Sequence, residues 1–244
     1  MRLLTNLVSM PALWALVQEH LGAPVFKREL YRSKLNPPCR LLDFGCASGH
    51  LGDAFRDLEY YGVDLDPVAI EAAKRRFHDQ PTMHFLATDL RDRPFPREFF
   101  DEILFAGTAH HLDDELLGSV LTELHFCLKC GGTVHLFDPV FQERTRWSQR
   151  LMRRIDQGRH TRTLAQILAI VEPLELFEYG ESSYHPPYGA LLQDCDFLYL
   201  PLKKTSPEGG DRAWPARIAA ERRGTEQCAV GSGPGADRVE QRPS

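Results

Sequence analysis

Short apolar runs alternate with helical patterns between residues 40 and 137, and this alternation restricts the fold more than any other feature. The apolar runs predict strands at Arg40–Phe44, Tyr60–Leu65, Met83–Ala87, Phe100–Phe105 and Thr133–Phe137. The intervening segments predict helices at Leu51–Leu58, Pro67–Phe77 and Asp113–Lys129, the last capped by Gly131 and Gly132. This pattern predicts an α/β fold with a doubly wound, mostly parallel sheet. Ligands of such sheets bind at the carboxyl ends of the strands.

The pattern changes on both sides of this region. Before it, Pro11–Leu21 predicts an amphipathic helix, so we expect residues 1–36 to form a helical cap. After Pro139, helices are predicted at Phe141–Arg162 and Thr163–Val171, followed by an antiparallel strand pair, Leu174–Tyr184 and Asp196–Leu202. We therefore expect one domain over residues 37–202, with a helical substrate cover inserted at about 141–172. Residues 203–244 are rich in Gly, Pro, Arg and Ser and are expected to be a disordered tail.

The composition is that of an ordinary globular protein. Of the 244 residues, 43% are hydrophobic, 26% are charged, and the formal net charge is −5, which disfavours a protein that coats nucleic acid. Six cysteines are too few for a disulfide scaffold and favour a reducing compartment. No apolar run reaches the roughly 18 residues of a membrane span, and the N-terminus lacks a clean cleavage signal. These features predict a cytoplasmic protein without a membrane partner.

Small and acidic residues gather at the predicted carboxyl ends of the first three strands. Asp43, Gly45 and Gly49 lie in a turn between a strand and a helix, where the backbone can approach a ligand closely. The turn does not match the G-x-G-x-x-G pattern of dinucleotide sites. Asp64 follows about 20 residues later, in position to accept bonds from ribose hydroxyls, and Asp89 ends the third strand. The residues indicate a nucleoside site without a pyrophosphate cradle.

These motifs, taken in order, resemble the class I S-adenosylmethionine-dependent methyltransferases. The similar blocks are Leu41–Gly49, Gly62–Pro67 with its helix, Phe85–Leu90, Phe100–Ile103 and Leu128–Thr133. The resemblance covers about residues 38–140 and implies a Rossmann-like fold with S-adenosyl-L-methionine as cofactor. Ala47 stands where the family usually has its second glycine, and Cys130 where it usually has proline. Alanine still lets the backbone approach the methionine end of the cofactor, provided that its φ stays negative.

The resemblance also implies roles for individual residues. Asp64 would bind the ribose diol, Asp89 with Leu90 would hold the adenine, and the turn braced by Asp43 would lie against the methionine end. The full set assigned to the cofactor is Asp43, Gly45, Cys46, Ala47, Gly49, Asp64, Leu65, Asp89, Leu90 and Ala106. Taken singly, the acids can also be read as strand-end caps or solvated loop residues.

Candidate catalytic and substrate residues lie in two further segments. His110 and His111 follow the fourth strand, where a base would be needed only if the acceptor loses a proton; packing in the loop is the alternative. Between the fifth and sixth strands lies an arginine-rich segment, represented by Arg146, Arg150 and Arg153, which could bind an anionic substrate or simply form a solvated basic helix. No metal site is predicted, because the Cys127–Cys130 pair has no second pair at suitable spacing.

The leading hypothesis is methyl transfer to O, N or C of a small or medium-sized acceptor by in-line displacement, with an anionic or carrier-bound acceptor as one option. Positioning of donor and acceptor can supply most of the rate of such a reaction. Adenine-N6 and cytosine-C5 chemistry are disfavoured because their signatures are missing from the corresponding strand ends. Two alternatives stay open, namely an RNA or protein methyltransferase and a non-catalytic methyltransferase-like scaffold. The sequence leaves the oligomeric state open.

Overall fold

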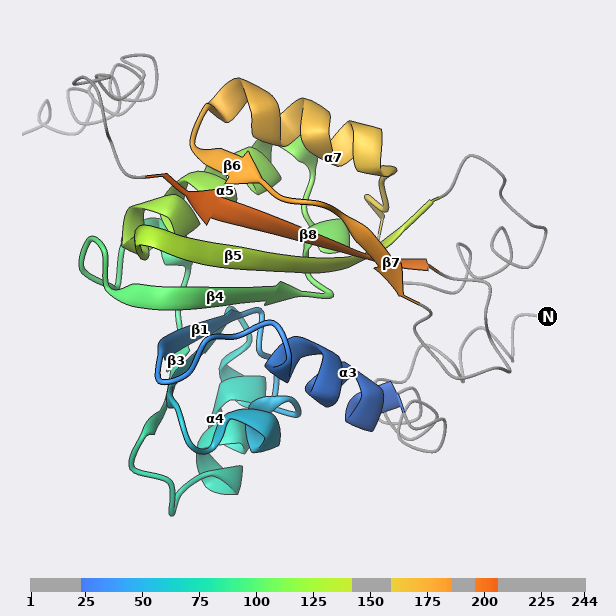
Figure 1. The fold of residues 1–244 in the computed structure, drawn as a ribbon. Coiled ribbons are helices and arrows are strands. Elements are labelled where there is room, and N and C mark those ends of the chain that lie inside the picture. Colours follow the sequence, from blue (N-terminus) through green and yellow to red (C-terminus); the bar gives the residue numbers. More distant parts are fainter. Residues whose placement is uncertain (1–22, 142–158, 186–195, 206–244) are drawn as a thin grey trace, which may run out of the picture. The chain divides into compact units, whose positions relative to one another are not determined.

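Eight strands form one mixed sheet in the part of the chain that the structure describes. The structure is a computed structural model, and it describes residues 23–141, 159–185 and 196–205 (Figure 1). The sheet order is β3-β2-β1-β4-β5-β8-β6, and β7 also pairs with β8. The strands are β1 (Arg40–Phe44), β2 (Glu59–Asp64), β3 (Met83–Ala87), β4 (Phe100–Ala106), β5 (Leu128–Val140), β6 (Phe177–Tyr179), β7 (Ser183–His185) and β8 (Asp196–Lys204). Strands β1 to β5 are parallel, and β8 is antiparallel to its three neighbours.

Helices cover both faces of the sheet, as the alternating pattern predicts. The α-helices are α3 (Ala23–Arg32), α4 (Pro67–Arg76), α5 (Asp114–Cys127) and α7 (Leu164–Val171). Short 3₁₀ turns are η1 (Gly52–Phe55), η2 (Leu90–Asp92), η3 (Ala109–His111) and η4 (Glu172–Leu174). One core joins α4, η1 and the end of α3 to the sheet, and the other joins α5 and α7 to the opposite face (Figure 1). The doubly wound, Rossmann-like expectation is confirmed, including the antiparallel strands at one side.

Several elements differ from the prediction. The helix predicted at Leu51–Leu58 is only the 3₁₀ turn η1, whose Gly52 lies so close to Phe77 that a Cβ would come within 2.8 Å of its ring. The helix α5 ends at Cys127 instead of Lys129, and the expected glycine cap is absent. The strand predicted at Thr133–Phe137 is longer at both ends, because β5 runs from Leu128 to Val140 and contains Gly131 with a φ of +80°. The single strand predicted at 174–184 is divided into β6 and β7.

The division between β6 and β7 lies opposite Pro201. A proline has no N–H to donate to a neighbouring strand. Tyr179 pairs with Leu202 on one side of this position and Ser183 pairs with Tyr199 on the other, while the N–H of Gly180 donates to the Pro201 carbonyl at 3.0 Å. The ladder is therefore interrupted where β8 cannot donate.

Two predicted helices fall wholly or mostly outside the described residues. Pro11–Leu21 lies there entirely, and α3 falls within the expected helical cap at residues 1–36, although no helix is predicted at its own position. Of the helix predicted at Phe141–Arg162, residues 142–158 lie outside, and the described end is not helical. Arg162 instead forms a parallel bridge with Val140 at the end of β5. The helix predicted at Thr163–Val171 is confirmed as α7, with Thr163 as its N-cap and Gln166 completing a capping box.

The last described strand ends on a buried lysine. β8 continues two residues beyond the predicted end at Leu202, to Lys204. Lys204 is 3% exposed, and its ammonium donates to the His125 and Leu128 carbonyls at 3.0 and 2.8 Å and to Glu98 at 3.3 Å. The strand is thereby fixed to the C-terminal end of α5, where the helix dipole favours a cation.

Candidate functional site

The turn after β1, residues 45–49, is the centre of the candidate site and is named the glycine turn here. It begins with the N–H groups of Gly45 and Cys46, which both donate to the Val63 carbonyl of β2 at 2.8 and 3.1 Å. Gly45 and Gly49 have φ values of +80° and +73°. A Cβ on Gly45 would lie 2.3 Å from the Thr108 hydroxyl, and one on Gly49 would lie 3.0 Å from the Phe77 ring. Both glycines are therefore required by the fold of the turn itself.

Ala47 lies in the same turn with a φ of +47°. Close approach of the cofactor to Ala47 is expected only if this φ is negative, and the structure does not meet that condition. An alanine in the left-handed region carries a steric cost that glycine does not. The Ala47 N–H donates to Asp64 Oδ2 at 2.9 Å, which holds the residue in this conformation.

Asp64 connects the glycine turn to the end of β2. Its second oxygen, Oδ1, accepts the N–H of Asp66 at 2.9 Å, and Asp66 in turn is the N-cap of α4. Each carboxylate oxygen thus uses one acceptor position and retains capacity for another bond. Next to Asp64, Leu65 is 70% exposed, and Val68 in the first turn of α4 is 73% exposed. A carboxylate beside two exposed apolar side chains suits a ribose with an attached flat base.

Asp43 lies beneath the glycine turn and is 2% exposed. Its Oδ2 accepts the Tyr60 hydroxyl at 2.6 Å. Burial raises the pKa of Asp43 to about 7; the Tyr60 hydrogen bond opposes this rise and the nearby charge of Asp64 adds to it. Cys46 is also buried, and a Cβ on Gly62 would lie 2.8 Å from its sulfur, so this side chain packs against Gly62 of β2. Both residues support the turn from below.

Asp89 and Leu90 lie at the end of β3 and differ in exposure. Asp89 accepts the Arg91 N–H at 2.9 Å as N-cap of η2 and also binds the Arg91 guanidinium at 2.6–3.0 Å. The hydrogen bond from the Arg91 side chain is the main cause that lowers the pKa of Asp89. The Leu90 side chain is 3% exposed in the core, so only its backbone can face a ligand. A nucleobase bound here would share the hydrogen-bond acceptors of the Asp89 carboxylate with Arg91.

The two candidate histidines lie in η3, directly after β4, and have different surroundings. His110 is buried, and its Nδ1 lies 2.9 Å from Asp138 Oδ1 at the end of β5. Burial raises the pKa of Asp138, while the His110 bond, the Ala109 backbone and the charge of Arg162 oppose this rise. His111 is exposed, and its ring centroid lies 4.1 Å from that of His110. The structure thus pairs His110 with a buried carboxylate.

Ala106 ends β4 and is half-buried beside the start of the glycine turn, since β4 pairs with β1. It is followed by Gly107, with φ +64°, and by Thr108, which lies against Gly45. The sequence analysis assigns no role to Thr108 or Asp138, and it groups Arg162 with the arginine-rich segment considered for substrate binding. Asp138 was detectable, because it follows directly on a predicted strand, at the edge where ligands bind.

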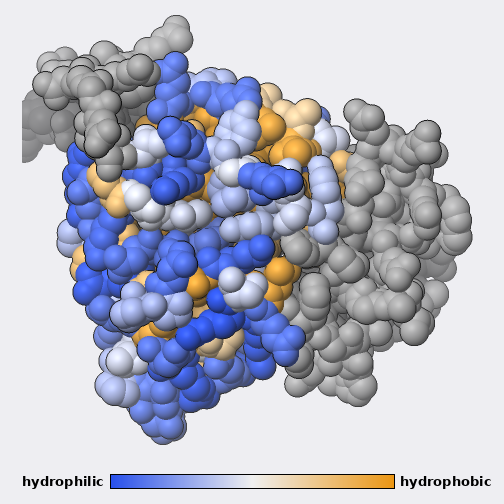
Figure 2. Space-filling model, viewed as in Figure 1, coloured by the Kyte–Doolittle hydropathy of each residue, from blue (hydrophilic) through white to orange (hydrophobic). Residues whose placement is uncertain are grey.

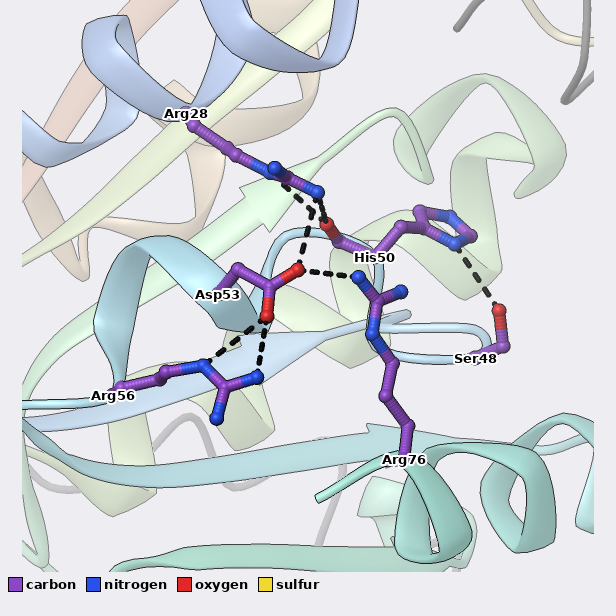
Figure 3. A network of polar contacts seen from close by, with 6 residues as sticks. All are labelled: Arg28, Ser48, His50, Asp53, Arg56 and Arg76. Atoms are coloured by element: carbon purple, nitrogen blue, oxygen red, sulfur yellow. Dashed lines mark hydrogen bonds and ion pairs between the residues drawn. The ribbon is translucent and has the colours of Figure 1, made fainter. Parts of the chain in front are cut away.

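An arginine cluster surrounds Asp53 of η1 beside the glycine turn (Figure 3). The Asp53 carboxylate binds Arg28 of α3 at 3.3 Å, Arg56 at 2.8 Å, and Arg76 at the end of α4. Arg28 also donates to the His50 carbonyl at 2.8 and 3.2 Å. Burial alone would raise the pKa of Asp53, but the Arg56 bond and the charges of Arg76 and Arg28 hold it below its usual value. The cluster ties α3 and α4 to the turn.

Other predicted features are remote from this edge or lie outside the described residues. Arg146, Arg150 and Arg153 lie outside them. Within the described ranges, no group of three or more His, Cys, Asp or Glu side chains could hold a metal, and no helix is long and apolar enough to cross a membrane. A cavity of about 260 Å³ opens at the amino-terminal edge of the sheet, beside Cys39, Arg40 and Lys129, away from the glycine turn. The face shown in Figure 2 is mainly hydrophilic, with apolar residues scattered over it.

Comparison with known proteins gives one family and several relatives. Residues 41–132 match the family model described as a methyltransferase domain. The fatty-acid O-methyltransferase of Mycolicibacterium smegmatis is 33% identical over 97 residues, which are 38% of this chain and 34% of that protein. The malonyl-[acyl-carrier protein] O-methyltransferase 1 of Ilyobacter polytropus is 24% identical over 125 residues, covering 50% of this chain and 44% of the relative. The chain thus spans between a third and a half of these relatives.

Solved structures show the same fold at low sequence identity. The YcgJ protein of Bacillus subtilis superimposes with a TM-score of 0.58 at 17% identity, covering 75% of this chain and 99% of that one. The geranyl diphosphate C-methyltransferase of Streptomyces coelicolor, solved with Mg²⁺, geranyl diphosphate and S-adenosyl-L-homocysteine, gives a TM-score of 0.61 at 12% identity, covering 74% and 80%.

Proposed function

We propose that the chain is a class I S-adenosylmethionine-dependent methyltransferase, because residues 41–132 match the family model described as a methyltransferase domain. It would transfer the methyl group of S-adenosyl-L-methionine to a small or medium-sized acceptor that is anionic or carrier-bound. The observation that carries the proposal is the bond from the Ala47 N–H to Asp64, because it holds the glycine turn and the acidic end of β2 together at the carboxyl edge of the sheet. A ligand there would meet the glycine turn and a carboxylate in one place.

Apart from Ala47, whose φ of +47° does not meet the condition stated for close approach, the described residues fit this cofactor. Asp64 would accept bonds from the ribose hydroxyls with the acceptor capacity that Ala47 and Asp66 leave. The exposed Leu65 side chain would cover one face of the adenine. Asp89 would bind the adenine amino group in exchange for part of its pairing with Arg91. The backbone of the glycine turn would lie along the methionine portion, with Ala106 beside it and Asp43 and Cys46 as support.

The cofactor supplies a methyl group on a sulfonium, and the chain supplies orientation and a proton acceptor. An acceptor that is already ionised, such as a carboxylate, loses no proton when its oxygen is methylated. A hydroxyl or amine acceptor must lose one, and a nearby imidazole can take it. His110, oriented by Asp138, is the group we assign to that step, with His111 next to it. The rate of methyl transfer should therefore depend on His110 for a hydroxyl acceptor and not for a carboxylate acceptor.

The names of the relatives favour an acyl acceptor. One relative is named for fatty acids, a second for phthiotriol and phenolphthiotriol dimycocerosates, and a third for malonyl on acyl carrier protein. An arginine segment would suit the carboxylate or phosphate of such molecules. We therefore extend the proposal to Arg146, Arg150 and Arg153 as groups that bind the anionic part of the acceptor.

Donor binding is tested by calorimetry with S-adenosyl-L-methionine and S-adenosyl-L-homocysteine. Asp64→Asn replaces one carboxylate oxygen by an amide that cannot accept a bond, so we expect the affinity to fall by about tenfold or more. Asp79→Asn changes an exposed acid after α4 and is the matched control, with unchanged affinity expected. Equal donor affinity in wild type and Asp64→Asn would refute the ribose assignment.

The acceptor is tested with methyl-labelled donor against fatty acids, malonyl carrier protein, RNA and protein extracts. Label in the first two classes supports the proposal. Label in RNA, with association that weakens steeply as salt rises, would support the nucleic-acid alternative. No donor binding at all would favour the non-catalytic scaffold.

A further inference from the structure

Arg162 makes an unusual number of contacts for one side chain at the edge of the candidate site. It is 6% exposed and precedes α7. One terminal nitrogen, Nη1, donates to the Ala109 and His160 carbonyls at 3.1 and 2.9 Å. The other, Nη2, donates to the Leu112 carbonyl at 2.7 Å and to Asp114 at 2.6 Å, and Nε also reaches Asp114 at 2.9 Å. A single guanidinium thus contacts both ends of η3.

The backbone around Arg162 is attached to the same region. The His160 N–H donates to the His110 carbonyl at 3.0 Å. Phe141 donates to the Arg162 carbonyl at 3.0 Å, and Val140 pairs with Arg162 in a parallel bridge. The chain therefore leaves the sheet after β5 and returns before α7 at the same place, next to η3.

From these contacts we propose that Arg162 is a positioning residue, which holds η3 so that the His110 ring stays against Asp138 at the carboxyl edge of the sheet. The proposal rests on the proposed function, because it gives His110 a task in methyl transfer. It also assigns a structural role to one member of the arginine-rich segment, which the sequence reading associated with substrate binding.

The need for such a residue follows from the shortness of η3. Within this three-residue 3₁₀ turn the Ala109 carbonyl accepts the Leu112 N–H, whereas the carbonyls of His110 and Leu112 have their partners outside the turn, in His160 and Arg162. A planar guanidinium with five donors can bind several carbonyls at fixed angles, which a lysine ammonium cannot do. Asp114, in the first turn of α5, compensates the charge from the solvent side with a side chain that is 78% exposed. The charge is therefore buried with most of its donors satisfied.

The charge of Arg162 also acts on Asp138. The groups that face Asp138 are the His110 ring, the Ala109 backbone and Arg162, with Asp114 beyond Arg162 and His111 beyond His110. Burial raises the pKa of Asp138, and Arg162 is one of the causes that oppose this rise. Removal of Arg162 should raise that pKa further, so that Asp138 takes up a proton at a higher pH and stops accepting from His110 as a carboxylate.

The test compares Arg162→Met, Arg162→Lys and Asp114→Asn in the full chain. Arg75→Met, an exposed arginine of α4 on the other face of the sheet, is the matched control. The first readout is nitrogen NMR of the histidines across pH, with the His110 signals identified by their loss in His110→Gln. We expect the wild-type ring to carry its proton on Nδ1, facing Asp138, and this signature to weaken in Arg162→Met, partly return in Arg162→Lys and persist in Arg75→Met.

The second readout is methyl transfer to whichever acceptor the labelled-donor assay identifies. For a hydroxyl or amine acceptor we expect Arg162→Met to lower kcat by about tenfold or more, because misplacement by about an ångström can cost up to a hundredfold. The KM for the acceptor and the affinity for the donor should stay within about twofold of the wild-type values. The acid limb of the pH profile of kcat should move to higher pH.

A variant that melts at a lower temperature but keeps the wild-type His110 signature and pH profile would overturn the proposal and leave Arg162 as a purely structural residue. If Arg162→Met does not fold, Arg162→Lys and the surface variant Asp114→Asn decide by the same readouts. Failure of the wild-type chain to bind donor would refute the proposed function instead, and the NMR comparison would still judge the role of Arg162.

Discussion

Replacement of Lys204 by methionine should destabilise the domain strongly. Its ammonium has three donors, and each has an acceptor: the His125 carbonyl, the Leu128 carbonyl and Glu98. The methionine side chain fills a similar apolar volume but donates nothing. Both carbonyls at the end of α5 then lose their charged partner in a buried place, and β8 loses its attachment to the helix.

The magnitude follows from the number and kind of bonds. A hydrogen bond to a charged group contributes roughly 1.5–3 kcal/mol, and a buried acceptor left without a partner costs about 1–3 kcal/mol. Part of this is offset because the variant no longer buries an ammonium. We expect a net loss of about 2–4 kcal/mol of unfolding free energy. For a domain of this size, a loss of about 3 kcal/mol corresponds to a Tm lower by about 6–12 °C.

Urea unfolding at pH 7 measures this loss, with Lys203→Met as the matched control. Lys203 is exposed on the same strand, so its replacement should change the free energy of unfolding by less than about 0.5 kcal/mol. Deletion of residues 204–244 should resemble Lys204→Met, whereas deletion of residues 206–244 should stay close to wild type. The reasoning is refuted if Lys204→Met and Lys203→Met are equally stable.

A second readout of the same variant is the titration of His125. Burial and the charges of Lys204 and Arg97 lower the pKa of His125 to about 4. Because Lys204→Met removes one of these charges, the pKa of His125 should rise in NMR titration. An unchanged titration would mean that the ammonium does not lie beside this residue.

Two further predictions concern the glycine turn. Ala47→Val places a β-branched residue at a φ of +47° and should cost about 1–3 kcal/mol in urea unfolding, whereas Ala47→Gly should be close to neutral; equal stability of the two variants would contradict the left-handed conformation. Burial raises the pKa of Asp43 from 3.8 to about 7, so its stabilising contribution is complete below about pH 4 and is lost as pH rises through about 7. The free energy of unfolding of Asp43→Asn relative to wild type should therefore increase between pH 4 and 8. If the difference between the two free energies does not change with pH, the pKa of Asp43 is not raised.

Much of the fold follows from local pattern. β1 and β3 have the predicted bounds, and β2, β4, α4 and α7 differ from prediction by one residue at either end. These elements have strong periodicity and clear start signals, such as Asp66 and Pro67 before α4 and Thr163 before α7. The order of small and acidic residues at the strand ends, from Gly45 to Asp89, likewise follows from the alternating pattern, because parallel strands bring their carboxyl ends to one edge.

The contacts within the site depend on tertiary structure. Ala47, with its positive φ, donates to the Asp64 carboxylate, which is 17 residues away in sequence. The His110–Asp138 pair spans 28 residues, and the bond from Lys204 to Leu128 spans 76. Local propensity and periodicity describe one segment at a time. The partner of a buried polar group depends on which strand ends and turns pack together, because burial is what makes an unpaired donor or acceptor costly.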